Sequence, residues 1–274
     1  MGITRRAALK GVLATTVGAL TGTSVYGVAY ERHQLGVTEA TLPVSGLAPA
    51  LTGLRIGLLT DVHHSRTVPA RDVIRAVDLL LAAHPDLIVL GGDYVTWGER
   101  AYVHPVAELL APLSAPHGVF AILGNHDDDR DMPRALIAHK FAVLKDQRTR
   151  ISVRGEPLEL AGIRFWTRRS TDIARVLRGA RDTTILLAHD PRRLTQAAAL
   201  NVPAVLSGHT HGGQVVLPGI GAIARRQFPV VAGLGRQDNT NIFVSRGVGT
   251  VYVPIRVNCP PEVAVITLRR QAAI

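Results

Sequence analysis

Short, almost continuous apolar runs alternate with amphipathic stretches along the middle of this chain. The first run, Leu54 to Thr60, has the composition of a strand that is buried on both faces of a sheet. A stretch with helical spacing follows and ends at His84-Pro85. Its apolar stripe consists of Val73, Ile74, Val77, Leu80 and Leu81. This succession predicts the first strand and helix of a parallel sheet.

The same alternation continues through the next forty or so residues. Asp86 to Gly92 is a second buried strand, and Val103 to Leu113 is a helix that prolines bring to an end. Val119 to Gly124 then forms a third strand. Strand and helix therefore alternate in βαβ fashion, which predicts a parallel central sheet.

The second half of the chain is richer in strands and turns, with one helix near Ile173 to Gly179. The predicted strands are Ile151 to Val153, Leu158 to Ile163, Thr184 to Ala188, Ala204 to Ser207, Gln214 to Leu217, Ile242 to Ser245 and Val263 to Leu268. We therefore expect an α/β fold, with two facing mixed sheets flanked by helices in α/β/β/α order. A single domain of this kind would span residues 53–270.

The N-terminal segment, residues 1–30, differs in character from the rest. Arg5, Arg6 and Lys10 precede an uncharged, weakly apolar stretch from Gly11 to Tyr30, which resembles a twin-arginine export signal. A small-residue cleavage site, Gly27-Val28-Ala29, and retention as a membrane anchor are both compatible with this stretch. The pattern predicts export to the periplasm or to the outer face of the cytoplasmic membrane. Residues 31–52 are expected to be a linker or an edge strand.

Charge and cysteine content narrow the classes of partner and site. The formal net charge is +10, and roughly +7 remains without the N-terminal segment, which favours anionic partners such as phosphate esters or a membrane surface. Aromatic residues make up only 4% of the chain, so a stacking platform for nucleic acid is disfavoured. Cys259 is the single cysteine, which excludes an internal disulfide and a thiolate zinc cluster. Any metal must use nitrogen and oxygen ligands.

Polar clusters follow the predicted strands at the points where the strands end. They are Asp61-Val62-His63, Gly92-Asp93, Gly124-Asn125-His126-Asp127, His189-Asp190 and Gly208-His209-Thr210-His211. One such cluster alone is as well explained by a carboxylate that caps the next helix. Because loops beyond the carboxyl ends of strands form the ligand crevice of α/β sheets, we expect these clusters to converge on one site.

The order of these clusters resembles the signature of the calcineurin-like metallophosphoesterases over about Leu54 to Leu268. The extended run from Gly208 to Gln214 is similar to that of the bacterial membrane-associated branch, as are Ser245 to Gly249 and Pro261-Glu262. That branch includes exported phosphodiesterases and UDP-2,3-diacylglucosamine pyrophosphatases.

The resemblance implies two divalent metal ions. Asp61, His63 and His211 would hold one ion, Asn125, His189 and His209 the other, and Asp93 would bridge both. Imidazole and carboxylate ligands suit Mn, Fe, Zn or Co better than they suit Ca. Two such ions lower the pKa of a bridging water, so hydroxide would be the nucleophile that attacks the phosphorus.

Further site residues are expected around the metals. The resemblance makes His126 the residue that contacts the phosphate and protonates the leaving oxygen. Asp127 follows it in the sequence and is expected to orient its ring as a hydrogen-bond partner. His64 would either reach the substrate or simply be solvated beside His63. Arg246 and Arg256 lie in segments that match the bacterial branch and are candidates to grip the phosphate.

The chain also departs from the family where many members have an acidic pair. Arg164-Phe165-Trp166-Thr167-Arg168-Arg169 occupies that place, so we expect a basic and aromatic rim and a substrate preference of its own. The segment Pro218 to Leu234 mixes apolar residues with Arg225 and Arg226, which fits either a membrane-facing surface or a packed loop.

The leading functional hypothesis is an exported, metal-dependent hydrolase of phosphodiester, phosphomonoester or pyrophosphate bonds. One alternative is a lipid-linked hydrolase similar to UDP-2,3-diacylglucosamine pyrophosphatase. Another class of protein, a metal-binding scaffold without catalysis, is disfavoured because His126 and Asp93 are both present. A nuclease would require a basic groove and a steep salt dependence of DNA binding.

Overall fold

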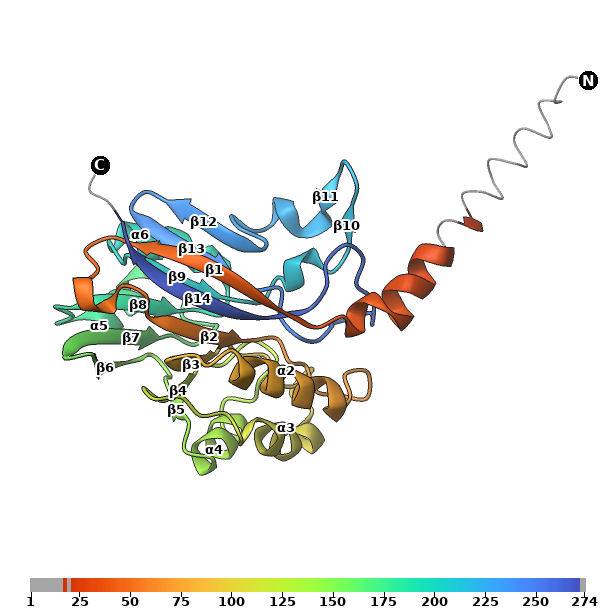
Figure 1. Cartoon of the computed structure of the whole chain (residues 1–274), viewed down its shortest axis with the longest axis horizontal. Coiled ribbons are helices and arrows are strands. Elements are labelled where there is room, and N and C mark those ends of the chain that lie inside the picture. Colours follow the sequence, from red (N-terminus) through yellow and green to blue (C-terminus); the bar gives the residue numbers. More distant parts are fainter. Residues whose placement is uncertain (1–16, 19–20, 272–274) are drawn as a thin grey trace, which may run out of the picture.

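The computed structural model describes residues 17–18 and 21–271 and shows two sheets that face each other between outer helices (Figure 1). Residues 21–29 are helical; Gly27 packs against Arg256, and toward its N-terminal end the helix points away from the body of the protein (Figure 1). Arg5, Arg6 and Lys10 lie outside the described residues, so the export signal stays a prediction. None of the helices in the described part of the chain is both long and apolar enough to cross a membrane.

The first sheet has the strand order β1-β14-β2-β3-β4-β5. Its strands are β1 (Gly36–Val44), β14 (Glu262–Arg270), β2 (Arg55–Leu59), β3 (Leu87–Leu90), β4 (Val119–Ala121) and β5 (Ala142–Val143). β2 to β5 are parallel, whereas β14 runs antiparallel to β2. Within residues 31–52, expected to be a linker or an edge strand, β1 lies at the edge of this sheet and pairs with β14 along its whole length. The domain therefore begins before residue 53.

The second sheet has the order β12-β13-β9-β8-β7-β6. Its strands are β12 (Gly233–Gln237), β13 (Thr240–Val244), β9 (Ala204–Ser207), β8 (Thr183–Leu187), β7 (Glu156–Gly162) and β6 (Gln147–Val153). The four inner strands are parallel, and the two edge strands run antiparallel to them. A small hairpin, β10 (Val216–Leu217) and β11 (Gly221–Ala222), stands apart from both sheets.

The helices cover the outer faces of both sheets. They are α2 (Ala70–Ala82), α3 (Val103–Leu110), α4 (Asp131–Ala138), α5 (Ser170–Leu177) and α6 (Leu194–Ala199). Short 3-10 helices are η1 (Glu31–His33), η2 (Pro49–Leu51), η3 (Arg100–Tyr102), η4 (Pro191–Arg193), η5 (His211–Gly213) and η6 (Ile223–Arg226). In Figure 1, α2 to α4 lie together against the first sheet.

Three apolar clusters correspond to the three interfaces between these layers. Leu58 and Val89 of the first sheet pack with Leu160 and Leu206 of the second, which fills the space between the sheets. A second cluster joins the first sheet to α2, α3 and α4, and a third joins the second sheet to α5 and α6. The predicted α/β/β/α arrangement of two mixed sheets is therefore confirmed.

One detail of the predicted helix stripe is wrong. In α2 the buried side chains are Val73, Ala76, Val77 and Leu80, whereas Ile74 is 46% exposed. These four positions follow the i, i+3, i+4, i+7 spacing of a single helix face, and Ile74 lies to one side of it. Ala76 was overlooked because a small side chain gives a weak hydrophobic signal.

Candidate metal centre

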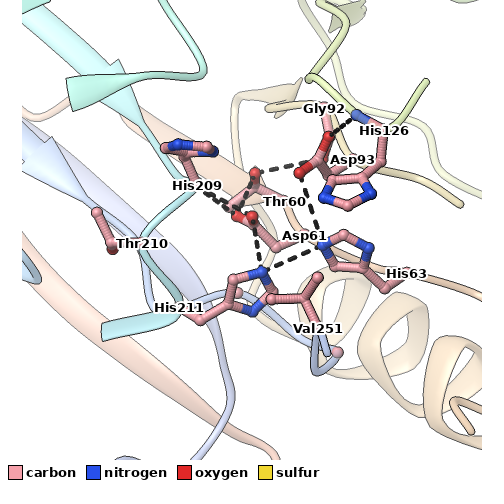
Figure 2. A network of polar contacts seen from close by, with 12 residues as sticks. Thr60, Asp61, His63, Gly92, Asp93, His126, His209, Thr210, His211 and Val251 are labelled. Carbon is pink, nitrogen blue, oxygen red and sulfur yellow. Dashed lines mark hydrogen bonds and ion pairs between the residues drawn. The ribbon is translucent and has the colours of Figure 1, made fainter. Parts of the chain in front are cut away.

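The predicted ligands come from loops that follow strands of both sheets. Asp61 follows β2, Asp93 follows β3, and Asn125 follows β4 in the first sheet. In the second sheet, His189 follows β8, and His209 with His211 follows β9. Figure 2 shows side chains from these loops pointing toward one another. The predicted convergence of the polar clusters is what the structure shows.

The backbone around the site adopts conformations that side chains rarely accept. Asp61, His63, Asp93, His209 and His211 all have positive φ angles, between 49° and 72°. Hydrogen bonds between neighbouring loops hold this backbone: Asp61 N–H donates to the Gly92 carbonyl at 2.9 Å, and His63 N–H to the Asp93 carbonyl at 3.0 Å. Such strain is typical of functional sites, where the surrounding structure enforces it.

Two glycines of the sequence motifs are explained by close packing against the site carboxylates. A Cβ at Gly124 would overlap the Asp93 carboxylate, and a Cβ at Gly208 would overlap the Asp61 carboxylate. The glycine that precedes Asn125 and the one that precedes His209 therefore let the strand ends approach these acids.

The ligand atoms form three overlapping groups. Within each group they lie within 4.8 Å of one another: Asp61, His63 and His211; His63, Asp93 and His126; Asp93, His189 and His209. Asp93 belongs to two groups, so the structure places it between the sets of residues expected to hold the two ions. Its Oδ2 is 3.0 Å from His189 Nε2 and 3.6 Å from His63 Nε2, and Figure 2 draws the contact with His63.

The chemistry of these donors fits a cation. The Nε2 atoms of His63 and His211 face each other at 3.1 Å, and His211 Nε2 is 3.4 Å from Asp61 Oδ1. The ring of His189 is oriented by Nδ1, which lies 2.8 Å from the Gly91 carbonyl, so Nε2 is directed into the site. The Oδ1 atom of Asn125 is buried without a hydrogen-bond partner among the described residues. A metal ion would satisfy these atoms together.

Burial keeps most of the site imidazoles neutral. It lowers the pKa of His63 to about 4 against the opposing charge of Asp93, and it lowers the pKa of His209 to about 3. Burial also takes the pKa of His211 well below its ordinary value. Metal ligation requires the neutral imidazole, so these histidines are available as ligands at neutral pH.

His189 differs because two carboxylates lie close to it. Burial alone would lower its pKa, but the charges of Asp93 and Asp61 raise it to about 10. For Asp61, burial and the charge of Asp93 raise the pKa to about 6, although His189 acts in the opposite direction. Two carboxylates therefore lie beside the His189 ring. A divalent cation that binds this imidazole would compete with its proton.

His126 has a fixed orientation beside the ligands. Its Nδ1 accepts a hydrogen bond from the Trp97 N–H at 3.0 Å, which assigns the remaining ring proton to Nε2. Burial lowers its pKa, whereas the charge of Asp93 raises it. Its own backbone N–H donates to Asp93 Oδ1 at 2.8 Å (Figure 2). Trp97 therefore holds the imidazole ring that was expected near the leaving group, and Asp93 holds the backbone of the same residue.

Asp127 has other partners than the one expected. Its carboxylate accepts backbone hydrogen bonds from the N–H groups of Asp93 at 2.7 Å, Tyr94 at 2.8 Å and Gly124 at 2.8 Å. The expectation that Asp127 orients His126 is therefore corrected, because its hydrogen bonds join the loops after β3 and β4. Burial raises its pKa to about 7 in spite of these donors.

The three residues expected to contact the substrate, His64, Arg246 and Arg256, have partners within the protein instead. The His64 ring is buried, with Nδ1 2.9 Å from the Val68 carbonyl, and packs edge-on against Tyr102. Arg246 forms an ion pair with Glu262 and donates to Thr38 Oγ1 at 3.1 Å. Arg256 is completely buried. The assignment of both arginines to substrate is corrected, because their guanidinium groups are already engaged within the protein.

Arg256 organises the loops behind the site. Its guanidinium donates to five backbone carbonyls, those of His211, Arg246, Gly247, Gly249 and Cys259.

Replacing Arg256 by methionine should lower the free energy of unfolding by about 3 kcal/mol or more, because each carbonyl left unpaired costs about 1–3 kcal/mol. Urea unfolding measures this change. The exposed Arg225→Met is the matched control, and an equally small change in both variants would contradict this role.

Some residues at the site mouth were not predicted from the sequence. A cavity of about 370 Å³ opens over the ligands, and Gln214, Phe228 and Tyr252 help to line it. Phe228 lies in the segment Pro218 to Leu234, and its ring is 5.5 Å from that of His209. In the same segment Ile220 is 70% exposed. One part of the segment therefore packs against the site, and another part is exposed to solvent. The signal for Gln214 was its place at the end of the motif run from Gly208, and for the two aromatic residues it was the apolar content of their loops.

Two sheets with Asp, Asn and His at facing strand ends define a class of metal-dependent hydrolases, and comparison with known proteins identifies the family. The sequence profile of the calcineurin-like phosphoesterases matches residues 54–213. The chain belongs to this family and is a metal-dependent phosphoesterase, as the motifs predicted.

Two bacterial relatives are similar in sequence over most of the chain. It is 32% identical to the uncharacterized metallophosphoesterase YkuE of Bacillus subtilis (strain 168), over 97% of this chain and 98% of that protein. It is 32% identical to the phosphodiesterase YaeI of Escherichia coli (strain K12), over 78% of this chain and 82% of that protein. Among solved structures, the NAD nucleotidase of Haemophilus influenzae is similar with a TM-score of 0.47 and 14% identity, over 71% of this chain and 45% of that one.

Proposed function

We propose that this protein hydrolyses phosphodiester bonds, and by the same chemistry phosphomonoester and pyrophosphate bonds, with two divalent metal ions. The observation that carries this proposal is the position of Asp93, which is shared by two of the ligand groups. The name of the Escherichia coli relative, a phosphodiesterase, supports a diester as the preferred substrate.

Each ion has its own ligands in this proposal. Asp61, His63 and His211 hold one ion, while Asn125, His189 and His209 hold the other. Asp93 contributes to both. The mixture of imidazole, carboxylate and amide donors suits Mn, Fe, Zn or Co. When bound, such ions activate water and offset the negative charge of the phosphoryl oxygens.

The protein supplies the remaining parts of the reaction. The cavity of about 370 Å³ has room for a phosphate and at least part of its ester groups. His126 borders this cavity with its assigned proton on Nε2, because Nδ1 accepts from Trp97. It is therefore placed to give that proton to the leaving oxygen, and it then recovers a proton from solvent. Its ring edge packs on His63, with centroids 4.9 Å apart, which limits its rotation.

Metal restoration tests the proposal. We expect the metal-stripped protein to be inactive on bis(p-nitrophenyl) phosphate and p-nitrophenyl phosphate. Adding Mn, Fe, Zn or Co should restore turnover of the diester, by at least about a hundredfold over the stripped protein. Ca serves as the control, since a hard cation that prefers oxygen ligands fits this donor set poorly. Bound transition-metal ions without hydrolysis of either ester would favour the scaffold hypothesis instead.

A further inference from the structure

A second hollow adjoins the metal-site cavity. It has a volume of about 220 Å³, and Arg66, Trp97, Glu99, Tyr252 and Val253 are among the residues that line it. Tyr252 lines both spaces. The second hollow and the metal-site cavity therefore meet at Tyr252.

Trp97 connects this hollow to His126. The centroids of the Trp97 and His126 rings are 4.5 Å apart at an interplanar angle of 61°, in addition to the backbone hydrogen bond to Nδ1. Trp97 also meets Tyr252 edge to face, with ring centroids 5.4 Å apart. A group that departs past His126 would thus meet these two aromatic rings next.

Both aromatic residues are held in unfavourable positions. The Trp97 side chain is 64% exposed and that of Tyr252 77% exposed. Their φ angles are 52° and 63°, in the left-handed region that bulky residues rarely adopt. Two rings kept in water by a strained backbone contribute little to the core, and such positions are typical of ligand-binding surfaces.

Charge and size indicate what the hollow would bind. Arg66 and Glu99 both line it, so the two charges offset each other and a second phosphate group gains no net attraction. A cavity of about 150 Å³ is enough to hold benzene. A space of about 220 Å³ beside two aromatic rings therefore suits a neutral, flat group of one or two rings.

We propose that this hollow binds the leaving group of the substrate, and that Trp97 and Tyr252 favour uncharged aromatic leaving groups over small polar alcohols. The proposal rests on the proposed function, because it takes His126 as the residue beside the leaving oxygen. The P–O bond to the aromatic alcohol breaks, water supplies the new oxygen on phosphorus, and the alcohol leaves with the proton from His126.

Two monoesters that differ only in the leaving group test this assignment. In Trp97→Ala, which keeps the backbone N–H to His126, kcat/KM for 1-naphthyl phosphate should fall about tenfold to a hundredfold. The value for glycerol 2-phosphate should change by less than about threefold. Trp97→Phe should recover most of the loss, since it restores a ring. Equal losses on both esters in Trp97→Ala would overturn the proposal.

Ile137→Ala is the matched control. Ile137 is another large apolar side chain, is 57% exposed, and lies on α4, where it lines neither of the two hollows. Its replacement should leave the ratio of the two kcat/KM values unchanged. The same change in ratio for Trp97→Ala and Ile137→Ala would overturn the assignment to the Trp97 side.

Binding can be followed without hydrolysis. Trp166→Ala leaves Trp97 as the single tryptophan, so quenching of its fluorescence by 4-nitrophenol reports on the hollow. We expect saturable quenching that Tyr252→Ala weakens about tenfold, and no quenching by inorganic phosphate. Quenching that never saturates would overturn the proposal even if the esters are hydrolysed. Absence of all hydrolysis together with saturable quenching would instead contradict the proposed function and leave the binding site supported.

Discussion

Replacing Asp93 by alanine should abolish metal binding and hydrolysis together, with a fall in kcat/KM of at least about a thousandfold. The reason is its position between His189 and His63, with Oδ2 3.0 Å and 3.6 Å from their Nε2 atoms. Alanine offers no ligand atom in place of this carboxylate. Metal content by plasma mass spectrometry and initial rates on the diester measure both losses.

Two further variants sharpen the result for Asp93. Asp93→Asn keeps an oxygen for the His126 N–H but removes the charge, and it should lose metal to nearly the same extent. Asp129→Ala removes an exposed carboxylate and should retain both metal and activity. Full metal content in Asp93→Ala, with activity near that of the unchanged protein, would refute the role of Asp93 as a shared ligand.

Replacing His126 by alanine should lower kcat about a hundredfold to ten-thousandfold while both metal ions remain bound. The expected loss depends on the leaving group. An alkyl ester needs a proton on its leaving oxygen, whereas p-nitrophenolate leaves without one, so the loss should be much smaller for p-nitrophenyl phosphate than for glycerol 2-phosphate. Parallel rate measurements on the two esters give this comparison.

The competing role for His126 is metal ligation, since it also lies within 4.8 Å of ligand atoms from His63 and Asp93. Loss of one metal ion from His126→Ala, with equal effects on both esters, would show that role and exclude proton donation. His104→Ala is a suitable control because this histidine is exposed on α3, and its replacement should affect neither property.

Much of the fold could be predicted because the central strands are uniformly apolar. β2, β3, β8 and β9 are buried along almost their whole length, and such runs stand out from the flanking residues. The edge strands were harder. β12 (Gly233–Gln237) was missed and only the end of β6 (Gln147–Val153) was found, because both alternate glycine or long polar side chains with few apolar ones. Solvent covers one face of such strands, so their hydrophobic signal is weak.

The metal ligands could be predicted because their placement follows from the strands. When buried parallel strands end at one edge, the residues that come next must meet there. The positions of the residues around the opening of the site do not follow from the strands in this way. Trp97 and Tyr252 occupy loops whose direction depends on positive φ angles and on contacts between distant segments, neither of which is visible in the sequence.

The arginines show a related limit. Arg246 and Arg256 were expected to meet phosphate because both lie in segments that match the bacterial branch, and loop arginines often bind phosphate. A loop arginine serves equally well as a buried donor for carbonyl groups that have no strand or helix partner, and this is the role of Arg256. Which of the two roles applies depends on the path of the loop around it.

A crystal structure of the protein grown with manganese, with anomalous diffraction data, would test the central claim most directly. We predict two anomalous peaks, one near Asp61, His63 and His211 and the other near Asn125, His189 and His209, with the Asp93 carboxylate between them. A single peak, or peaks that leave Asp93 without contact, would contradict the account of a shared dinuclear site.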